Sequence, residues 1–530
     1  MKRLNLHIPL IIIVMVTALV YARTLENGIL NWDDQTHITN NSDIQSLSIQ
    51  NIKAIFTSYY VKMYHPLVTL SFAIEYHFFG LNSTVYHATN VLFHLANVVL
   101  VFYFVLLLSR RRETAIIVAC LFGIHPMHVE SVAWIAERKD VVYAFFYLSA
   151  LIFYLRFIRQ GKVINYWMVC FCFILSLFSK TAAITLPIVL FMVDIYLHRE
   201  STVRTFLEKL PLLLLSLVFG LIALHSQGEG EGARYFVGDN FNFIDQFFLA
   251  SYSLCYYIIH LFLPINLSAL HLLPIKIEGL LPAEYYLALI PLSILAFIGT
   301  RKGIFQREYV FGLLFFVLGV SLHIHIVPIG MAIVSERYTY LAYVGLYYII
   351  GQLYSFSFER YQDFLLSWKK PIITGMTLLT LFFGYITYER IGVWNNTSLL
   401  FQDAAMKASS TAEKNFIQTF NYMFEADDKN RMKLYADAIE CFNKAIVLSP
   451  QMPDLYVNRA VAKINLHDYN SAMKDCEKAI ELNPSFAPAY PNRALLYILS
   501  NRQEEACADL WTAYRLGLHN VFDFYPINCF

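Results

Sequence analysis

Long apolar stretches recur along most of this 530-residue chain, and they constrain its fold more than any other feature. About 20 apolar residues can cross a lipid bilayer as a helix, and stretches of this kind continue to about residue 388. With 57% hydrophobic and only 15% charged residues, the chain does not have the composition of an ordinary soluble protein. We expect membrane segments at 8–22, 84–109, 114–131, 140–158, 163–179, 181–197, 210–226, 246–263, 284–300, 309–326, 338–356 and 371–388.

Basic residues between the segments predict their orientation, because cytoplasmic loops are enriched in Lys and Arg. They follow the second, fourth and sixth segments, at 110–112, 156–162 and 198–209. If every later segment crossed the membrane, Arg301 and Lys302 would lie outside. A non-crossing segment 246–263 removes this conflict and gives 11 crossings, with the C-terminal part on the outer side. Whether 246–263 spans the membrane stays open.

The composition changes after Trp394, where charges become frequent and a 34-residue repeat appears. Tyr456, Asn458, Arg459 and Ala460 recur as Tyr490, Asn492, Arg493 and Ala494, and Pro450 recurs as Pro484. The period, the small residues and the closing Pro predict tetratricopeptide repeats, which are paired helices, with about three units between 411 and 517. Such arrays present a concave surface to a peptide or protein.

These patterns predict an all-α protein with two domains. The first is a polytopic membrane domain, residues 1–390, whose first outer loop is 23–84. A linker at 391–410 leads to the repeat domain at 411–530. Within the first loop, an apolar and aromatic stretch from His65 to Gly80 suits a helix that lies in the membrane interface.

Two adjacent carboxylates, Asp33 and Asp34, follow the first apolar segment and start the first outer loop. Adjacent carboxylates repel each other, so such a pair tends to hold a proton, a cation or a hydroxylic ligand. One of them is a candidate general base. An ordinary solvated turn is the alternative for the pair taken alone.

Further polar residues stand at the predicted outer ends of the membrane segments, where ionisable groups are costly. They are His125, His128, Glu130, Glu137, Arg138, Lys180, Glu336, Arg337 and Tyr338. Arg138, Lys180 and Arg337 could neutralise a phosphate at the level of the lipid headgroups. Alternatively, they anchor the interface or pair with Glu130, Glu137 and Glu336.

Composition and spacing argue against several other kinds of site. The net charge of +1 and the lack of basic clusters argue against a nucleic-acid partner. No Cys-x-x-Cys occurs, so neither a zinc site nor a redox pair is indicated. His125, His128 and Glu130 could ligate a metal, but Pro126 breaks the helical geometry between the two His. We predict no metal site, although a requirement for a divalent cation stays open.

Several blocks together resemble the transmembrane and tetratricopeptide-repeat O-mannosyltransferase-like family, including its bacterial members. The blocks are Trp32-Asp33-Asp34, His65-Pro66-Leu67, Tyr86-His87-x-x-Asn90 with His94, His125-Pro126-x-His128-x-Glu130 through Glu137-Arg138-Lys139-Asp140, Ser179-Lys180-Thr181, and Glu336-Arg337-Tyr338-Thr339-Tyr340.

The resemblance implies a membrane glycosyltransferase of the C-type fold, which moves a sugar such as mannose from a polyprenyl-phosphate donor to an acceptor hydroxyl. It implies that Asp33 or Asp34 is the base, that His65 and the polar residues named above bind substrate, and that the repeats hold an acceptor protein. It also implies an integral protein of a bacterial inner membrane, with the first loop and the repeats on the periplasmic side.

Three other functions compete with this interpretation. In a transporter or flippase the charges would lie near mid-bilayer within broken helices, whereas here they stand at segment ends. A non-catalytic membrane platform could recruit partners through its repeats alone. A polysaccharide polymerase or ligase would use closely related chemistry. The sequence does not determine the sugar, the carrier lipid, the acceptor or the oligomeric state.

Overall fold

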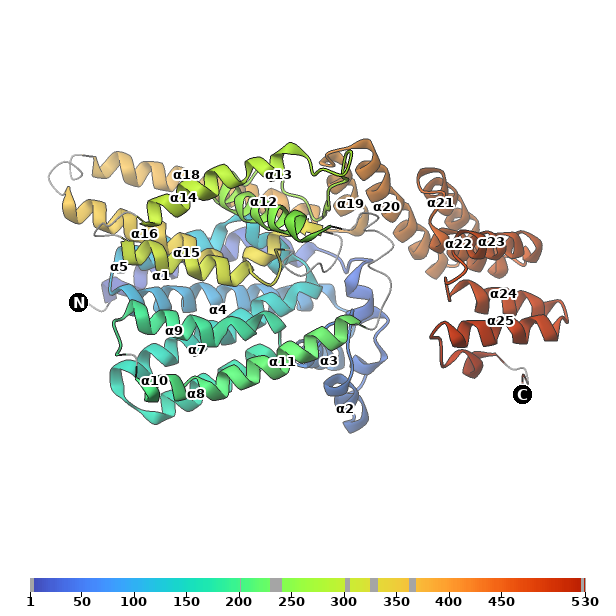
Figure 1. Ribbon diagram of the computed structural model, residues 1–530, viewed down its shortest axis with the longest axis horizontal. Helices are drawn as coiled ribbons and strands as arrows, with labels where there is room; N and C mark the ends of the chain where they lie inside the picture. Colours follow the sequence, from blue (N-terminus) through green and yellow to red (C-terminus); the bar gives the residue numbers. More distant parts are fainter. Residues whose placement is uncertain are drawn as a thin grey trace. The chain divides into compact units, whose positions relative to one another are not determined.

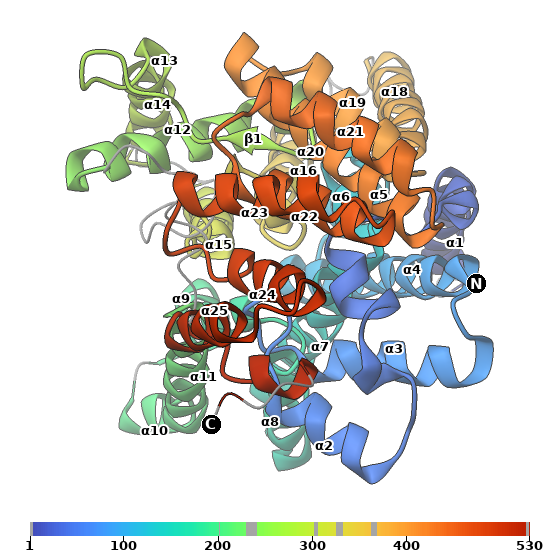
Figure 2. The same ribbon diagram turned by 90° about the vertical axis from the view of Figure 1, so that its right-hand side faces the viewer.

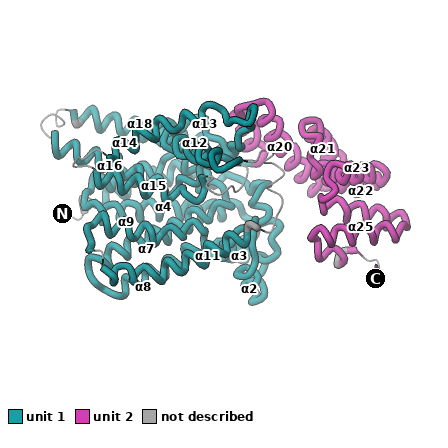
Figure 3. The backbone as a smooth tube through the Cα atoms, viewed as in Figure 1, with its two compact units in different colours: residues 1–396 teal, residues 397–530 magenta. Residues whose placement is uncertain are grey.

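The computed structural model describes residues 4–200, 202–228, 241–300, 306–324, 332–361, 368–525 and 529. Within these residues the chain is almost entirely helical (Figure 1), and its strands form only a two-stranded antiparallel sheet, β1 (His271–Leu272) with β2 (Ala332–Val334). The predicted all-α fold is confirmed. The chain divides into two compact units, residues 1–396 and 397–530 (Figure 3).

Most of the long helices of unit 1 run roughly along a common direction, whereas α12 (Phe243–Phe262) lies across it (Figures 1 and 2). The long helices are α1 (Leu4–Tyr21), α4 (Ser83–Ser109), α5 (Arg112–Ile124), α7 (Arg138–Gln160), α8 (Val163–Leu177), α9 (Leu186–Tyr196), α11 (Leu210–Gly228), α12, α14 (Leu289–Thr300), α15 (Gln306–Val320), α16 (Tyr343–Arg360) and α18 (Lys369–Val393). Shorter helices are α2 (Ile49–Thr57), α3 (Pro66–Phe79), α6 (Val129–Ala133), α10 (Val203–Leu207) and α13 (Ala283–Leu287). Each predicted membrane segment overlaps one of the long helices.

Six helical stretches of unit 1 are long and apolar enough to cross a membrane, within the part of the chain that is described. They are His7–Glu26, Ser83–Ser109, Ile135–Gln160, Val203–Ser226, Ala283–Thr300 and Lys370–Val393. Unit 1 therefore has the helices of an integral membrane protein. The segment 246–263 is one continuous helix, α12, and it is not among these six. Arg301, Lys302 and the end of the predicted span 309–326 lie outside the described residues.

The third predicted span, 114–131, differs from a straight helix. Helix α5 ends at Ile124, and the chain continues through Pro126–Ala133 at an angle of 58°. The cause is local, because a Pro disfavours the helical conformation of the residue before it, here His125. The bend turns the polar residues that follow toward the start of α7.

Helices α15 and α16 approach each other closely where two glycines face each other. A Cβ atom on Gly312 would overlap the carbonyl oxygen of Gly345, and a Cβ atom on Gly345 would overlap that of Gly312. Small residues let helix backbones approach in this way, and close packing is what holds apolar helices together in lipid. The crossing fixes the start of α16, which begins at Tyr343, six residues after Arg337.

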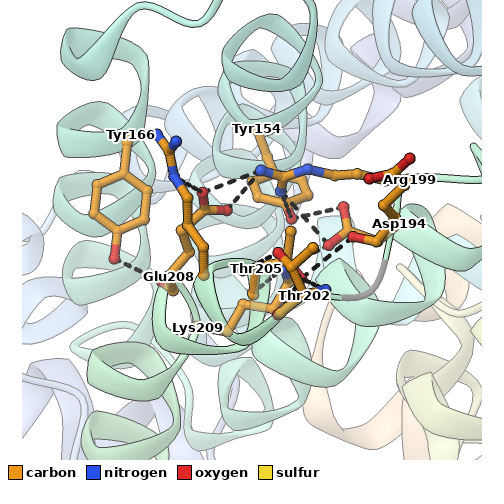
Figure 4. A network of polar contacts seen from close by, with 10 residues as sticks. Tyr154, Tyr166, Asp194, Arg199, Thr202, Thr205, Glu208 and Lys209 are labelled. Carbon is orange, nitrogen blue, oxygen red and sulfur yellow. Dashed lines mark hydrogen bonds and ion pairs between the residues drawn. The ribbon is translucent and has the colours of Figure 1, made fainter.

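A buried polar network joins the C-terminal parts of α7 and α9 to the turn before α11 (Figure 4). Lys209 is fully buried and pairs with Asp194 at 2.5 Å, and Tyr154 donates to Asp194 at 2.8 Å. Arg199 pairs with Asp194 at 3.6 Å and with Glu208 at 2.8 Å. Two carboxylates and two cations balance, so the network stabilises this end without leaving a net buried charge.

Unit 2 contains three successive helix pairs that follow a first helix, α19 (Thr397–Met406). The pairs are α20 (Thr411–Arg431) with α21 (Tyr435–Leu448), α22 (Pro453–Asn465) with α23 (Tyr469–Leu482), and α24 (Ala489–Leu499) with α25 (Gln503–Arg515). Phe401 of α19 packs on Phe424 of α20 at 5.1 Å between ring centroids. The predicted linker 391–410 is therefore corrected: its first residues end α18, and 397–406 form a helix that packs on the repeats.

The repeated residues make repeated contacts in unit 2. Tyr456 donates to the carbonyl oxygen of Pro450 at 3.0 Å, and Tyr490 donates to that of Pro484 at 2.7 Å. Arg459 pairs with Asp475 at 2.6 Å, and Arg493 pairs in the same way with Asp509 at 2.8 Å. The 34-residue period of the sequence thus reflects contacts that recur in successive repeats.

A disulfide joins Cys507 of α25 to Cys529, 22 residues later. Between them, Val521 and Phe522 pack against Leu510 and the neighbouring small residues of α25. The chain after α25 therefore covers the apolar face of the last repeat, as an end cap of a repeat array must do. This bond could not be predicted from the sequence, because nothing in the spacing of the four tail cysteines distinguishes a pair.

Candidate active site

Segments that are far apart in the sequence meet at one end of unit 1. The backbone N–H of Ala136 donates to Asp34 at 2.8 Å, which joins the first loop to the start of α7. Lys180 pairs with Asp140, and the backbone N–H of Arg337 donates to Glu130 at 3.0 Å. The meeting point lies at helix ends, where the chain must leave the apolar region.

Asp34 is fully buried and both of its oxygens are engaged by backbone groups. One accepts from the N–H of Ala136, and the other accepts from the N–H of Leu30 at 2.9 Å. Burial raises the pKa of Asp34 to about 7, although the two backbone donors act in the opposite direction. This carboxyl group fastens the first loop to the residues before α7.

Asp33 has different surroundings, although it is adjacent in sequence. Its side chain is half-buried. Burial raises the pKa of Asp33, and the nearby charges of Lys139 and Arg337 lower it while that of Glu137 raises it. Of the two carboxylates, Asp33 is the one that keeps an exposed part and lies among charged groups.

The charged groups around Asp33 form ion pairs with one another. Arg337 pairs with Glu130 and, through Nε at 3.3 Å, with Glu137. Lys139 also pairs with Glu137, at 2.9 Å. The side chain of Arg337 is 18% exposed, whereas that of Lys139 is 4% exposed. Arg337 can therefore be reached from outside, whereas Lys139 acts from within the protein.

Lys180 and Asp140 extend the cluster on the side of α8. Lys180 pairs with Asp140, and its side chain is 11% exposed. The ammonium group also lies 5.8 Å from the ring of Tyr338. With Asp33, the cluster contains four carboxylates and three cations. An arriving phosphate must therefore compete with carboxylates that already hold Arg337 and Lys180.

Arg138 was predicted to face a phosphate, but protein groups surround it. It is 0% exposed and pairs with Glu75 at 2.5 Å. Its other donors reach Asn90 at 2.9 Å and the carbonyl oxygen of Tyr86 at 2.8 Å, and the guanidinium lies 4.4 Å from the ring of Phe72. These contacts favour a structural role for Arg138, which joins α3, α4 and α7.

His125 and His128 are fully buried and bonded to neighbouring helices. Nε2 of His125 lies 3.0 Å from the carbonyl oxygen of Leu261, and Nε2 of His128 lies 3.4 Å from the hydroxyl of Tyr347. Among the described residues no three His, Cys, Asp or Glu side chains are grouped so that they could hold a metal ion. The two His therefore stand at a helix contact.

The other predicted substrate-binding residues lie at different depths. Glu336 is fully buried, 3.6 Å from Arg390 of α18. Tyr338 stacks on His323 at 4.2 Å and lies beneath the guanidinium of Arg337 at 5.0 Å. Tyr338 thus belongs with the charged cluster, whereas Glu336 faces α18.

His65 is buried at the start of α3, 4.9 Å from the ring of His37.

Lys139, Asp140 and His37 lie at or beside the cluster, although the sequence did not mark them as site residues. Lys139 and Asp140 stand inside the quoted Glu137–Asp140 block, so the block itself was the available signal. His37 lies four residues after Asp33, a spacing that puts two side chains on one helical face. The sequence did not show that a helical turn begins there.

This arrangement can perform two chemical tasks. A half-buried carboxylate whose pKa is raised by burial can accept a proton from a hydroxyl group. Cations that are partly exposed at helix ends can balance an anion. The aromatic residues Trp32 and Trp134, stacked at 4.6 Å, line the same region next to Asp33.

The tetratricopeptide-repeat family matches residues 453–486. Protein O-mannosyl-transferase TMTC1 of Mus musculus is 32% identical over 155 residues, which cover 27% of this chain and 16% of that protein. TMTC3 of Homo sapiens is 30% identical over 166 residues, covering 29% and 18%. TMTC2 of Homo sapiens is 38% identical over 95 residues, covering 18% and 11%. Over these stretches the chain is similar to the transmembrane and tetratricopeptide-repeat O-mannosyltransferases. The resemblance to this family is confirmed, whereas its bacterial type stays a prediction.

The matches span less than a fifth of the length of these O-mannosyltransferases. Solved structures that match include the first TPR of Spaghetti (RPAP3) bound to an HSP90 peptide, 26% identical, covering 20% of this chain and 87% of that chain at a TM-score of 0.20. The OM64 TPR domain of Arabidopsis is also 26% identical, covering 20% and 88% at a TM-score of 0.20.

Proposed function

We propose that this protein is a membrane glycosyltransferase that moves a sugar, such as mannose, from a polyprenyl-phosphate donor to a hydroxyl group of an acceptor protein. The relatives that carry the name O-mannosyl-transferase support the reaction class. The observation that carries the proposal is the half-buried Asp33 beside Lys139 and Arg337, at the ends of apolar helices.

In the proposed reaction Asp33 is the general base. It takes the proton of the acceptor hydroxyl as the hydroxyl oxygen bonds to the anomeric carbon. The bond from that carbon to the phosphate oxygen breaks, and polyprenyl phosphate leaves. A carboxylate whose pKa is raised by burial is a better proton acceptor than an exposed one. Asp34 holds the loop in place.

Arg337 and Lys180 would balance the charge of the leaving phosphate, because both keep part of their side chain exposed. Lys139 would contribute its charge without touching the phosphate, since it is held by Glu137 and is almost fully buried. Binding of the phosphate would loosen the pairs with Glu130 and Asp140. Arg138 takes no part in this contact, because Glu75 and backbone groups already engage it.

We also propose that the first loop and the repeats face away from the cytoplasm. Basic residues gather at the helix ends opposite Asp33, which supports this orientation. The disulfide Cys507–Cys529 supports it independently for unit 2, because such bonds persist in oxidising compartments. The repeats would then meet an acceptor protein on the side where the sugar is transferred. That this membrane is a bacterial inner membrane stays a prediction.

The experiment that tests the proposal uses the purified protein in lipid nanodiscs with a panel of polyprenyl-phosphate sugars and a peptide rich in Ser and Thr. We expect release of polyprenyl phosphate and sugar-modified peptide from at least one donor. If no donor of the panel reacts while the protein remains folded, the proposal of a transferase is wrong. A non-catalytic membrane platform then becomes the better account.

A further inference from the structure

Two buried histidines beside Asp33, His37 and His65, have ring nitrogens without a hydrogen-bond partner among the described residues. His37 is 1% exposed, and both of its ring nitrogens are unpaired. His65 is 2% exposed; its Nδ1 lies 3.3 Å from the Thr69 hydroxyl, and its Nε2 is unpaired. The ring centroids are 4.9 Å apart. Buried polar atoms are nearly always paired, so three unpaired nitrogens in one place indicate that something else bonds to them.

A fourth unpaired atom lies in the same neighbourhood. Oε2 of Glu137 is buried without a partner within the described part of the chain, while Oε1 holds Lys139 and Arg337. The hydrogen bond of 2.8 Å from the backbone N–H of Ala136 to Asp34 holds the residue before Glu137 against the turn that carries His37. The charges of Glu137 and Lys139 accordingly act on the pKa values of His37 and His65. The four atoms come from the first loop, the start of α3 and the start of α7.

We infer that His37 and His65, with Glu137, form a subsite that binds hydroxyl groups of a sugar. The unpaired atoms include imidazole nitrogens, which can donate or accept, and a carboxylate oxygen, which accepts. Neighbouring sugar hydroxyls offer both a donor and an acceptor at each position. The sugar of the lipid-linked donor is the ligand to which we commit, and this inference rests on the proposed function.

The chemistry of the subsite argues against an anion or a metal ion. Burial and the charge of Lys139 lower the pKa of His65 to about 3. Burial also lowers the pKa of His37 well below its ordinary value. Both rings are therefore neutral at physiological pH. A neutral imidazole offers an anion no charge, and Glu137 would repel one. The two His are not part of any group that could hold a metal ion among the described residues.

The test measures binding and does not depend on turnover. Full-length protein in nanodiscs is titrated with polyprenyl-phosphate mannose, with sugar-free polyprenyl phosphate, and with a Ser/Thr peptide. We expect His37→Phe and His65→Phe each to weaken binding of the sugar-bearing lipid about tenfold, the scale of a lost buried hydrogen bond. Binding of sugar-free polyprenyl phosphate should not change. His37→Gln and His65→Gln should recover part of the loss, because the amide can still donate and accept.

Two control variants separate ligand binding from folding. Exposed His77 is replaced by Phe as the neutral control. Buried His87, whose Nε2 lies 3.2 Å from the carbonyl oxygen of Gly28, is replaced by Phe as the structural control and should lower the melting temperature. His37→Phe should leave the melting temperature unchanged or raise it, because removing an unpaired buried polar group does not destabilise the fold.

The outcomes distinguish the possible sources of the hydroxyl. If only the peptide binds more weakly to the Phe variants, the hydroxyl groups belong to the acceptor, and our assignment to the donor sugar is overturned. If all three probes bind the Phe variants as they bind the wild type, the histidines bind only water and the subsite is wrong. If the wild type binds no sugar-bearing lipid better than sugar-free lipid, the proposed function fails together with the subsite.

Discussion

Arg138 and Arg337 stand at similar helix ends, yet their surroundings give them different roles. Arg138 is enclosed by Glu75, Asn90 and backbone oxygen atoms, whereas Arg337 is partly exposed. We predict that Arg138→Met destabilises the protein by about 3–5 kcal/mol, because it leaves the charge of Glu75 buried and unpaired. The double variant Arg138→Met/Glu75→Leu should recover most of that loss in a thermal or denaturant unfolding experiment. If Arg138→Met unfolds like the wild type and only donor binding weakens, Arg138 is a phosphate ligand after all.

Asp34 gives the protein a pH dependence of its own. Its pKa in the folded state is about 7, above the ordinary 3.8, so the folded state favours the protonated form. Stability from this group is fully present below about pH 4 and is lost as the pH rises through 7. Asp34→Asn cannot titrate and still accepts from Ala136, so its melting temperature should fall less than that of the wild type between pH 4.5 and 7.5. Identical slopes for the two proteins would contradict the burial of Asp34.

Single residues also show how much of the site could be predicted from the sequence. The sequence identified Asp33, Glu130, Glu137, Lys180 and Arg337 because charged residues are rare beside apolar segments. It could not choose between the two aspartates, because the choice depends on the backbone N–H groups of Leu30 and Ala136. It also assigned Arg138 to the substrate, since its partner Glu75 lies 63 residues away in the chain.

The crossing of α15 and α16 offers a test at the level of elements. Gly→Ala in a helix normally stabilises it by up to about 1 kcal/mol. At Gly312 we predict the opposite sign, because the added Cβ would overlap the carbonyl oxygen of Gly345. Gly220 of α11 is the matched control, since its Cβ would meet nothing within 4 Å. Melting temperatures should therefore fall for Gly312→Ala and stay level or rise for Gly220→Ala. A fall of equal size in both variants would contradict the close crossing.

The helices of unit 1 follow the apolar pattern, so their existence could be predicted from the sequence. Their breaks were harder to place, because a break such as the 58° bend after α5 follows from the conformation next to Pro126 and from packing. In unit 2 the 34-residue period gave the three helix pairs, whereas α19 lies outside the period and was taken for a linker. The disulfide depends on a contact that no spacing revealed.

At the scale of the whole molecule, the orientation of the repeats can be measured directly. We predict that a cysteine placed at exposed Asn465 of α22 is labelled by a membrane-impermeant reagent in intact cells. A cysteine at exposed Lys162, between α7 and α8, is the matched control and should be labelled only after the membrane is opened. The reverse pattern would place the repeats in the cytoplasm, where a lasting Cys507–Cys529 bond is not expected.

The central claim is that Asp33 takes the proton of the acceptor hydroxyl while Asp34 only holds the loop. The most direct test compares steady-state sugar transfer from a polyprenyl-phosphate donor to a peptide by the wild type, Asp33→Asn and Asp34→Asn. Asparagine keeps the size of the side chain but removes its basicity, and general-base assistance is typically worth about 10²–10⁴-fold in rate. We predict that Asp33→Asn loses turnover on that scale with an unchanged melting temperature, and that Asp34→Asn loses less. Transfer by Asp33→Asn at nearly the wild-type rate would contradict the claim.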